Sequence, residues 1–181
     1  VFDGSRDGFG EDDCPRPLNV YGWSKLSGEG LWKIAADKYY IIRSSWFFGR
    51  NLPKKGFDFP RKILALAHQG EEIRVVNDQF GSPTYTKDLA GKIKEVIDQR
   101  LPFGVYHITN SGRCSWYELA KEVLAFSGVQ AQLTPIATSE SGSGIRRPRN
   151  SVLINRRLKE AGLRLLRPWP EALKEYLKEI N

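Results

Sequence analysis

The sequence contains no methionine, only two cysteines and no long apolar run, and each of these absences excludes a class of protein. No apolar stretch approaches the roughly 18 residues that a membrane-spanning helix needs, and no signal peptide opens the chain. The cysteines, Cys14 and Cys114, form no CxxC pair, which argues against a disulfide scaffold and a thiolate metal site. A composition of 40% hydrophobic and 27% charged residues differs from that of a disordered chain or a coiled coil. These features predict a globular protein of a reducing, cytoplasmic setting, with no membrane partner.

The beginning of the chain also lacks the usual start of a gene product. Val1 opens what reads as the middle of an apolar strand, and a whole gene product normally starts with methionine and carries a few more. We therefore expect the chain to be a piece of a longer protein. Its 181 residues suffice for one domain, and because no long linker divides them we expect a single α/β unit over 1–181.

Charge is distributed unevenly along the chain. The first 20 residues hold two basic and five acidic side chains, whereas residues 145–181 hold ten basic and four acidic ones. Most of the formal net charge of +7 therefore belongs to the last fifth of the chain. Basic surface attracts anions such as nucleic acid, acidic lipid or phosphorylated small molecules. Because no nucleic-acid-binding motif accompanies these residues, we expect no nucleic-acid partner.

Strand and helix patterns alternate along the chain, which is typical of an α/β fold. Continuous apolar character within residues 38–46 predicts a parallel strand covered on both faces, and shorter strands are expected at 73–76 and 105–109. A flexible loop is expected at 139–144. Helices are expected over residues 18–37, 60–69, 87–99, 116–126, 151–161 and 170–180.

Side-chain patterns support two of these helices. The helix 87–99 is expected to bury one apolar face, formed by Leu89, Ile93, Val96 and Ile97. The helix 116–126 has a capping-box pattern, Ser115 with Glu118, and Gly128 follows its end.

A tyrosine and a lysine lie four residues apart in the first expected helix. On a helix, this spacing places Tyr21 and Lys25 on one face, about 6 Å apart along the axis. A phenol has a pKa of about 10, and an ammonium group beside it favours the phenolate and lowers that pKa. The pair is a candidate general acid, although a tyrosine packed under a lysine stem has the same spacing. Gly22, Gly28 and Gly30 weaken this helix, and we expect them to admit another backbone or a ligand.

These residues belong to a longer pattern that resembles the extended short-chain dehydrogenase/reductases, and within them the dTDP-4-dehydrorhamnose reductase branch. Its most specific signature is VVNDQFGSPT at residues 75–84. The match continues in order over essentially the whole chain, at residues 1–4, 17–29, 43–49, 88–90, 106–110, 115–118, 147–151 and 168–173. The resemblance implies the C-terminal part of an NAD(P)-binding Rossmann-like fold together with a smaller substrate-binding lobe.

The resemblance implies a role for each of five residues. Tyr21 would protonate the C4 oxygen of dTDP-4-dehydro-L-rhamnose as hydride from NADPH or NADH reaches C4. Lys25 would hold the nicotinamide ribose and lower the pKa of Tyr21, and Ser45 would also contact the cofactor. Trp46 would line the sugar pocket, and Arg147 would face the diphosphate, whose oxygens match a guanidinium fork. From the residues alone, Trp46 also fits plain core and Arg147 a solvated loop.

The glycine-rich turn that binds the dinucleotide in such enzymes is absent from the sequence. The hydroxyl partner of the catalytic tyrosine would likewise lie upstream of Val1. We therefore expect the 181 residues alone to be inactive. The choice between NADPH and NADH, a requirement for Mg²⁺ and assembly into a homodimer stay open.

A second class of function fits the same resemblance. A non-catalytic, dinucleotide-binding regulatory subunit similar to methionine adenosyltransferase β would have the same fold. The intact Tyr21 and Lys25 pair favours the enzyme. Related epimerases and dehydratases share that pair, but the run that begins at Asp78 and Gln79 favours the reductase.

The remaining polar residues of interest are expected to be structural. Asp78 and Gln79 would organise a turn through side-chain bonds to the backbone. His68 and His107 have no partner at metal-ligand spacing, so we expect structural histidines and no metal site at either.

Overall fold

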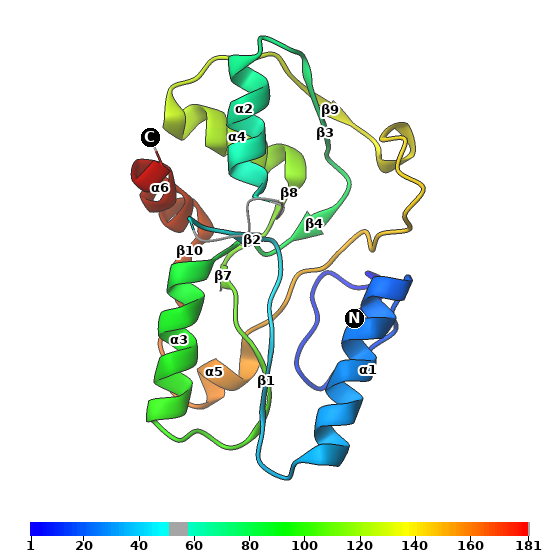
Figure 1. Cartoon of the computed structure of the whole chain (residues 1–181), viewed down its shortest axis with the longest axis vertical. Helices are drawn as coiled ribbons and strands as arrows, with labels where there is room; N and C mark the ends of the chain where they lie inside the picture. The colour runs from blue at the N-terminus through cyan, green and yellow to red at the C-terminus, as the bar shows by residue number, and fades with distance from the viewer. Residues whose placement is uncertain (51–57, 181) are drawn as a thin grey trace.

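The computed structural model describes residues 1–50 and 58–180, and it places them in two parts along the long axis of the molecule (Figure 1). The lower part in that view holds α1 (Val20–Ala35), β1 (Tyr40–Arg43), α3 (Thr86–Asp98), β6 (Gly104–His107) and α5 (Arg156–Glu160). The upper part holds α2 (Phe59–His68), β3 (Ile73–Val76), α4 (Trp116–Ser127) and β9 (Leu133–Ile136). The chain therefore passes repeatedly between the two parts.

Short elements make up the rest of the described structure. They are β2 (Phe47–Phe48), β4 (Phe80–Gly81), β5 (Thr84–Tyr85), β7 (Asn110–Ser111), β8 (Cys114–Ser115), the 3₁₀ turn η1 (Thr138–Glu140), β10 (Leu166–Pro168) and the C-terminal helix α6 (Trp169–Ile180). Within the described residues, no helix is long and apolar enough to cross a membrane.

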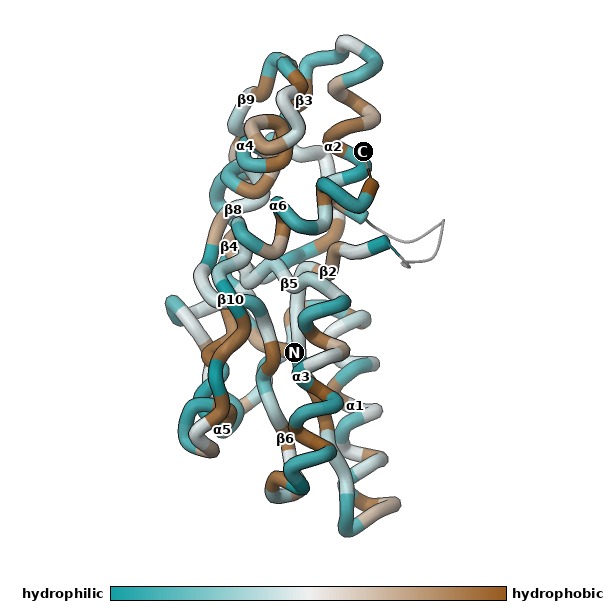
Figure 2. Tube along the Cα trace, turned by 90° about the vertical axis from the view of Figure 1, so that its left-hand side faces the viewer, coloured by the Kyte–Doolittle hydropathy of each residue, from teal (hydrophilic) through white to brown (hydrophobic). Residues whose placement is uncertain are grey.

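Parallel pairing dominates the strands. β1 pairs with β6 in register from Tyr40 opposite Gly104 to Arg43 opposite His107. β3 pairs with β9, β2 with β5 and β10 with β7, all in parallel, whereas β4 and β8 are antiparallel. Parallel neighbours need a crossover between them, and helices supply most of these crossovers here. Figure 2 shows α1 and α3 on one side of β6 and α5 on the other.

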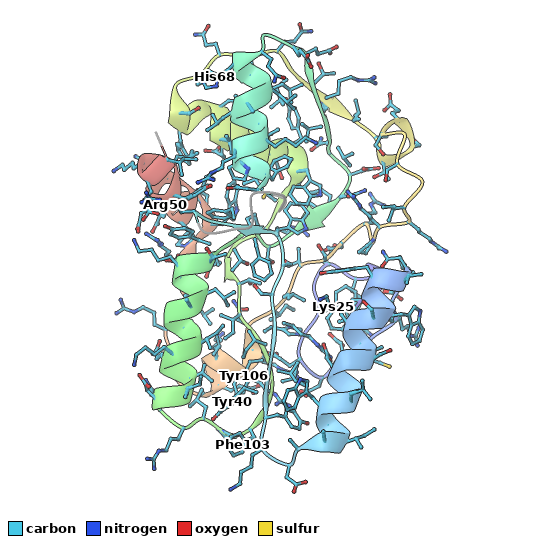
Figure 3. All side chains as sticks on the ribbon, in the orientation of Figure 1. Lys25, Tyr40, Arg50, His68, Phe103 and Tyr106 are labelled. Carbon is cyan, nitrogen blue, oxygen red and sulfur yellow. The ribbon has the colours of Figure 1, made fainter. Side chains whose placement is uncertain are left out.

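Each part has its own hydrophobic cluster. The larger cluster, in the upper part, includes Phe48, Leu119 and Tyr176, and the smaller one consists of Val96, Tyr106, Ile108 and Leu158. Tyr40 and Phe103 close the lower end of the smaller cluster (Figure 3), with ring centroids 5.1 Å apart.

Several expected elements are confirmed. α4 has the complete capping box: the Ser115 hydroxyl accepts from the Glu118 backbone N–H at 3.1 Å, and the Ser115 N–H donates to the Glu118 carboxylate at 2.6 Å. Gly128 follows this helix in the left-handed conformation, with φ of 71°. The strand at 73–76 has the expected bounds. The strand at 105–109 and the helices near 18–37, 60–69 and 170–180 are present, each shifted or shortened by one or a few residues.

Two expectations about burial are wrong. Ile97, expected on the buried face of α3, is 51% exposed, whereas Val96 is fully buried. The apolar residues of β1 are only half-buried, although the strand is parallel as expected. The outer side of α1 also exposes Leu31, Trp32 and Ile34.

Two expectations about secondary structure are also wrong. The helix predicted for 151–161 is confined to α5, because residues 149–151 are extended beside β4: Phe80 donates to the Arg149 carbonyl and Ser151 donates to the Phe80 carbonyl, both at 2.8 Å. The loop predicted for 139–144 begins inside η1, where the Glu140 carboxylate accepts from the Ala137 N–H at 2.7 Å.

The acidic beginning of the chain contacts the basic end. Asp12 forms ion pairs with Arg156 and with Arg157, the latter at 3.0 Å. Glu11 accepts from the Arg157 backbone N–H at 3.2 Å. Part of the C-terminal positive charge is therefore neutralised within the chain.

Candidate active site

Helix α1 begins at a capped turn that contacts the segment before α5. Asn19 is the N-cap: its side-chain oxygen accepts from the Gly22 N–H at 2.8 Å, and its amide donates to the Arg146 carbonyl at 2.9 Å. A Cβ on Gly22 would lie 2.9 Å from the Cβ of Pro17, so this close approach requires glycine. Asparagine before a helix is a recognisable capping signal, but no pattern in the sequence reveals the contact between Asn19 and Arg146.

The other two glycines of α1 face open space. A Cβ on Gly28 or Gly30 would have no neighbour within 4 Å among the described residues. The expectation of a close neighbour is met at Gly22, by Pro17, and stays a prediction at Gly28 and Gly30.

Tyr21 and Lys25 lie on one face of α1, in its first two turns. The Lys25 Nζ is 5.3 Å from the centroid of the Tyr21 ring. Tyr21 is 70% exposed, Lys25 is exposed as well, and Figure 3 shows Lys25 on the upper half of α1. The phenol is therefore open to a ligand and has an ammonium group beside it.

A cavity of about 690 Å³ opens beside the start of α1. Its volume is within the range of about 300–1,000 Å³ that is usual for ligand sites. Four of the five predicted site residues line it, namely Tyr21, Ser45, Trp46 and Arg147. Lys25 is not part of the lining, but its Nζ contacts the Tyr21 ring. The full lining is Val1, Phe2, Pro17, Leu18, Asn19, Tyr21, Gly22, Ser44, Ser45, Trp46, Phe47, Gln79, Trp116, Ile145, Arg147, Pro148 and Ser151.

Trp46 forms an aromatic wall of this cavity together with Trp116. The two rings are stacked, with centroids 3.6 Å apart and planes 9° from parallel. Trp46 has a left-handed backbone, with φ of 49°, which costs a non-glycine residue about 1–2 kcal/mol. Gly81 lies against the Trp46 ring so closely that a Cβ there would be 2.2 Å from Trp46 Cε2. This close packing fixes the position of the ring. Trp116 is a further site residue, and the sequence indicates only that it begins a helix.

Two serines follow the carboxyl end of β1 and line the cavity. The Ser45 hydroxyl donates to the Ser82 carbonyl at 3.0 Å, which leaves its lone pairs free to accept. The Ser44 hydroxyl is buried and has no hydrogen-bond partner within residues 1–50 and 58–180. An unpaired buried hydroxyl is costly, and at a cavity wall it is available to a bound polar group. In the sequence, nothing marks Ser44 as a site residue except its position next to Ser45.

Arg147 brings positive charge to the cavity from the loop before α5. Its side chain is exposed and makes no ion pair within the described part of the chain. A free guanidinium group at a cavity is suited to a phosphate or diphosphate.

Asp78 and Gln79 bond to a turn in a distant segment, η1, and Asp78 does so through the expected bond between side chain and backbone. The Asp78 carboxylate accepts from the Thr138 backbone N–H at 3.0 Å, and Gln79 donates to the Thr138 hydroxyl at 3.0 Å. These bonds hold η1 near the cavity that Gln79 lines.

The histidines are engaged with backbone groups. His68 Nδ1 is 2.7 Å from the Leu64 carbonyl oxygen, and His107 Nδ1 is 3.1 Å from that of Phe9. Burial and the nearby Arg43 charge lower the pKa of His107 to about 4. Across residues 1–50 and 58–180, no group of three or more His, Cys, Asp or Glu side chains is placed to hold a metal ion, so nothing there supports a Mg²⁺ site.

Known proteins share this arrangement over almost the whole chain. The spore coat polysaccharide biosynthesis protein SpsK of Bacillus subtilis (strain 168) is 44% identical over 171 residues, which cover 94% of this chain and 58% of that protein. A dTDP-4-dehydrorhamnose reductase of Streptomyces griseus is 36% identical over 173 residues, which cover 92% of this chain and 56% of that protein. The chain thus spans less than two thirds of the length of these relatives.

A solved structure confirms the expected α/β fold class. The crystal structure of dTDP-4-dehydrorhamnose reductase from Bacillus anthracis in complex with NADP matches with a TM-score of 0.92 at 37% identity, over 99% of this chain and 62% of that one. The family described as the RmlD substrate binding domain matches residues 1–181. The family resemblance noted in the sequence is therefore confirmed, and the chain belongs to the RmlD substrate binding domain family.

Proposed function

We propose that the protein carrying this chain reduces the 4-keto group of dTDP-4-dehydro-L-rhamnose to give dTDP-L-rhamnose, with residues 1–181 acting as one α/β unit. The observation that carries the proposal is that Tyr21, Trp46 and Arg147 line the same cavity, with the Lys25 ammonium group beside the Tyr21 ring. The names of the relatives point to the same substrate class and, through SpsK, to polysaccharide biosynthesis.

In this proposal, Tyr21 is the general acid. Its hydroxyl donates a proton to the C4 oxygen of the sugar while hydride is added to C4, so that the ketone becomes an alcohol. Lys25 favours the phenolate that remains, because its positive charge stabilises the deprotonated form. The exposure of Tyr21 allows the sugar carbonyl to reach the hydroxyl.

Substrate binding falls to the aromatic wall and to Arg147. A flat indole packs well against the apolar face of a pyranose ring, and Trp46 is held in place by Trp116 and Gly81. Arg147 binds the diphosphate of the nucleotide sugar, since its guanidinium group has no ion-pair partner within the described part of the chain.

The residues present fit the nicotinamide end of a dinucleotide. The unpaired Ser44 hydroxyl and the accepting lone pairs of Ser45 offer hydrogen bonds beside Tyr21, and Lys25 is free to bind ribose hydroxyls. A bound nicotinamide cofactor supplies hydride, and NADPH is the proposed form because the Bacillus anthracis relative was solved with NADP. We place the pyrophosphate contacts outside these 181 residues, which contain no glycine-rich turn.

Turnover in a fused protein tests the proposal. The amino-terminal portion of the Bacillus subtilis relative would be joined to this chain, and NADPH oxidation followed by absorbance with dTDP-4-dehydro-L-rhamnose as substrate. Tyr21→Phe should lower turnover by about 10²-fold or more, with a much smaller change in substrate affinity. Tyr117→Phe is the matched control, because it removes a phenol that does not line the cavity and should leave turnover unchanged. Full turnover in Tyr21→Phe would refute the proton-donor role, and NADPH binding without turnover would favour the regulatory-subunit alternative.

Binding to the unfused chain separates the substrate site from the cofactor site. We expect dTDP-L-rhamnose to bind, and Arg147→Met to weaken that binding, as measured by calorimetry. We expect no tight NADPH binding, because one charge-assisted contact from Lys25 supplies about 1.5–3 kcal/mol against the 4–15 kcal/mol that association costs. Saturable micromolar NADPH binding would show that the cofactor site lies within these residues.

A further inference from the structure

A buried, two-pronged ion pair joins α1 to β1 near the Tyr21 and Lys25 pair. Arg43 Nε donates to one carboxylate oxygen of Glu29 at 2.8 Å, and Arg43 Nη2 donates to the other at 2.6 Å. The two side chains are 8% and 10% exposed. Both oxygens of Glu29 are therefore occupied by the guanidinium group.

Glu29 is the acidic residue of α1 and lies four positions after Lys25. Tyr21, Lys25 and Glu29 follow one another at intervals of four, so they form a stripe along one side of the helix. A lysine and a glutamate at this spacing are neighbours on the helix surface and are able to form a weak ion pair. Lys25 nevertheless has no ion pair within residues 1–50 and 58–180, and its Nζ lies over the Tyr21 ring.

We propose that Arg43 is a positioning residue: by occupying both oxygens of Glu29, it keeps that carboxylate away from Lys25 and leaves the ammonium group to act on Tyr21. The inference rests on the proposed function, in which Tyr21 is the proton donor. Arg43 touches neither substrate nor cofactor in this account. Arg43 determines whether the Lys25 ammonium group interacts with the Glu29 carboxylate or with the Tyr21 phenolate.

The charged groups around the ion pair come from several elements. From β6, His107 Nε2 faces Arg43 Nη1 at 3.5 Å, and its lowered pKa keeps it neutral near pH 7. Glu11 accepts from the His107 N–H at 3.2 Å.

Two further groups complete these surroundings. The Phe2 ring centroid lies 5.3 Å from Arg43 Cζ. Across the cavity, Arg147 is the positive group that shares the lining with Tyr21. These neighbouring charges also contribute to the pKa values that are measured after a substitution at Arg43.

The proposal gives opposite expectations for changes on the two sides of the ion pair. Shortening the fork in Arg43→Lys leaves a single point donor, which cannot occupy both carboxylate oxygens. Arg43→Met removes the donor altogether. In both variants Glu29 is released toward Lys25, and the pKa values of Lys25 and Tyr21 rise. In Glu29→Gln no carboxylate competes, so neither pKa rises.

The test is an NMR titration of the 181-residue chain with ¹³C-labelled tyrosine and lysine, which reads the two pKa values without any need for turnover. We expect Arg43→Met to raise both by about 0.2–0.4 pH units, the equivalent of an exposed i,i+4 ion pair. Arg43→Lys should give a smaller rise in the same direction. The double variant Arg43→Met with Glu29→Gln should return both values to those of the unaltered chain.

Arg147→Met is the matched charge control. It removes a positive group from the same cavity, and Arg147 forms no ion pair with a carboxylate within the described part of the chain. It should shift the two pKa values less than Arg43→Met does, and Glu29→Gln should not reverse its effect. If Arg43→Met does not fold, because it leaves a buried carboxylate unpaired, Arg43→Lys decides the question.

Unchanged pKa values in a folded Arg43 variant would overturn the inference, as would failure of Glu29→Gln to restore them, or an equal and equally reversible shift in Arg147→Met. Failure of the proposed function is seen separately, as full turnover of Tyr21→Phe in the fused protein. That outcome would leave the measured pKa coupling between Arg43, Glu29 and Lys25 in place.

Discussion

Replacing Gly81 with alanine tests the packing of the cavity wall. The added Cβ would lie 2.2 Å from Trp46 Cε2 and 2.5 Å from its Nε1, so the ring has to move. The ring is not free to move, because it is stacked on Trp116 at 3.6 Å between centroids. Overpacking costs about 1–3 kcal/mol and a lost aromatic pair about 0.5–1.5 kcal/mol. We expect the free energy of unfolding to fall by about 2–4 kcal/mol.

The same chemical change at Gly91 should have the opposite effect. Gly91 lies inside α3, and a Cβ there would have no described neighbour within 4 Å. Alanine is the better helix former by about 0.5–1 kcal/mol, so Gly91→Ala should stabilise the chain by that amount. Because both variants add one methyl group, a loss of stability in Gly81→Ala beside a gain in Gly91→Ala points to the contact with Trp46.

Urea unfolding, followed by circular dichroism, measures both variants, and calorimetry with dTDP-L-rhamnose measures the cavity. We expect Gly81→Ala to lower both the urea midpoint and the affinity for the ligand, and Gly91→Ala to raise the midpoint with no change in affinity. Equal stability of the two variants would refute the argument, since it would mean that the Trp46 ring does not rest on Gly81.

Three further predictions concern other parts of the chain. The pKa of His107 falls from 6.5 to about 4 on folding, so the unfolded chain binds a proton more readily between these pH values. The free energy of unfolding should therefore fall by up to about 3 kcal/mol as the pH is lowered from about 6.5 to 4. His107→Gln should make the urea midpoint depend less on pH over that range. Cys14 is exposed, whereas burial raises the pKa of the Cys114 thiol, so a thiol reagent should modify Cys14 alone in the folded chain and both after denaturation. The exposed apolar side of α1 should promote self-association, and Trp32→Glu should lower the mass found by light scattering; an unchanged mass would contradict this.

The features that could be predicted from the sequence are those that neighbouring residues determine. The cap of α4 depends on Ser115, Glu118 and Gly128, which lie within one short segment. The spacing of Tyr21 and Lys25 along α1 is likewise a property of a single helix. The family motifs added the expectation of a sugar pocket, and Trp46 and Arg147 do line one cavity.

The features that were missed depend on distant partners. Strand β9 contains Pro135, which argues against a strand, but it lies at an edge and pairs only with β3 among the described strands. Residues 149–151 are extended because Phe80 bonds to them, a contact that local helix propensity does not reveal. Trp116 became a site residue only because folding stacks it on Trp46.

The bond from Asn19 to the carbonyl of Arg146 joins residues that are 127 positions apart, and Asn19 lines the cavity. The cavity is thus assembled from sequence-distant segments, and its contact order is high. Long-range contacts of this kind form slowly, because the entropy of closing a long loop is lost before the contact is gained. We expect the helices to form before the cavity does, so ligand binding should report the last step of folding. For the same reason, moving a single loop between relatives will not transfer the site, because no contiguous segment contains it.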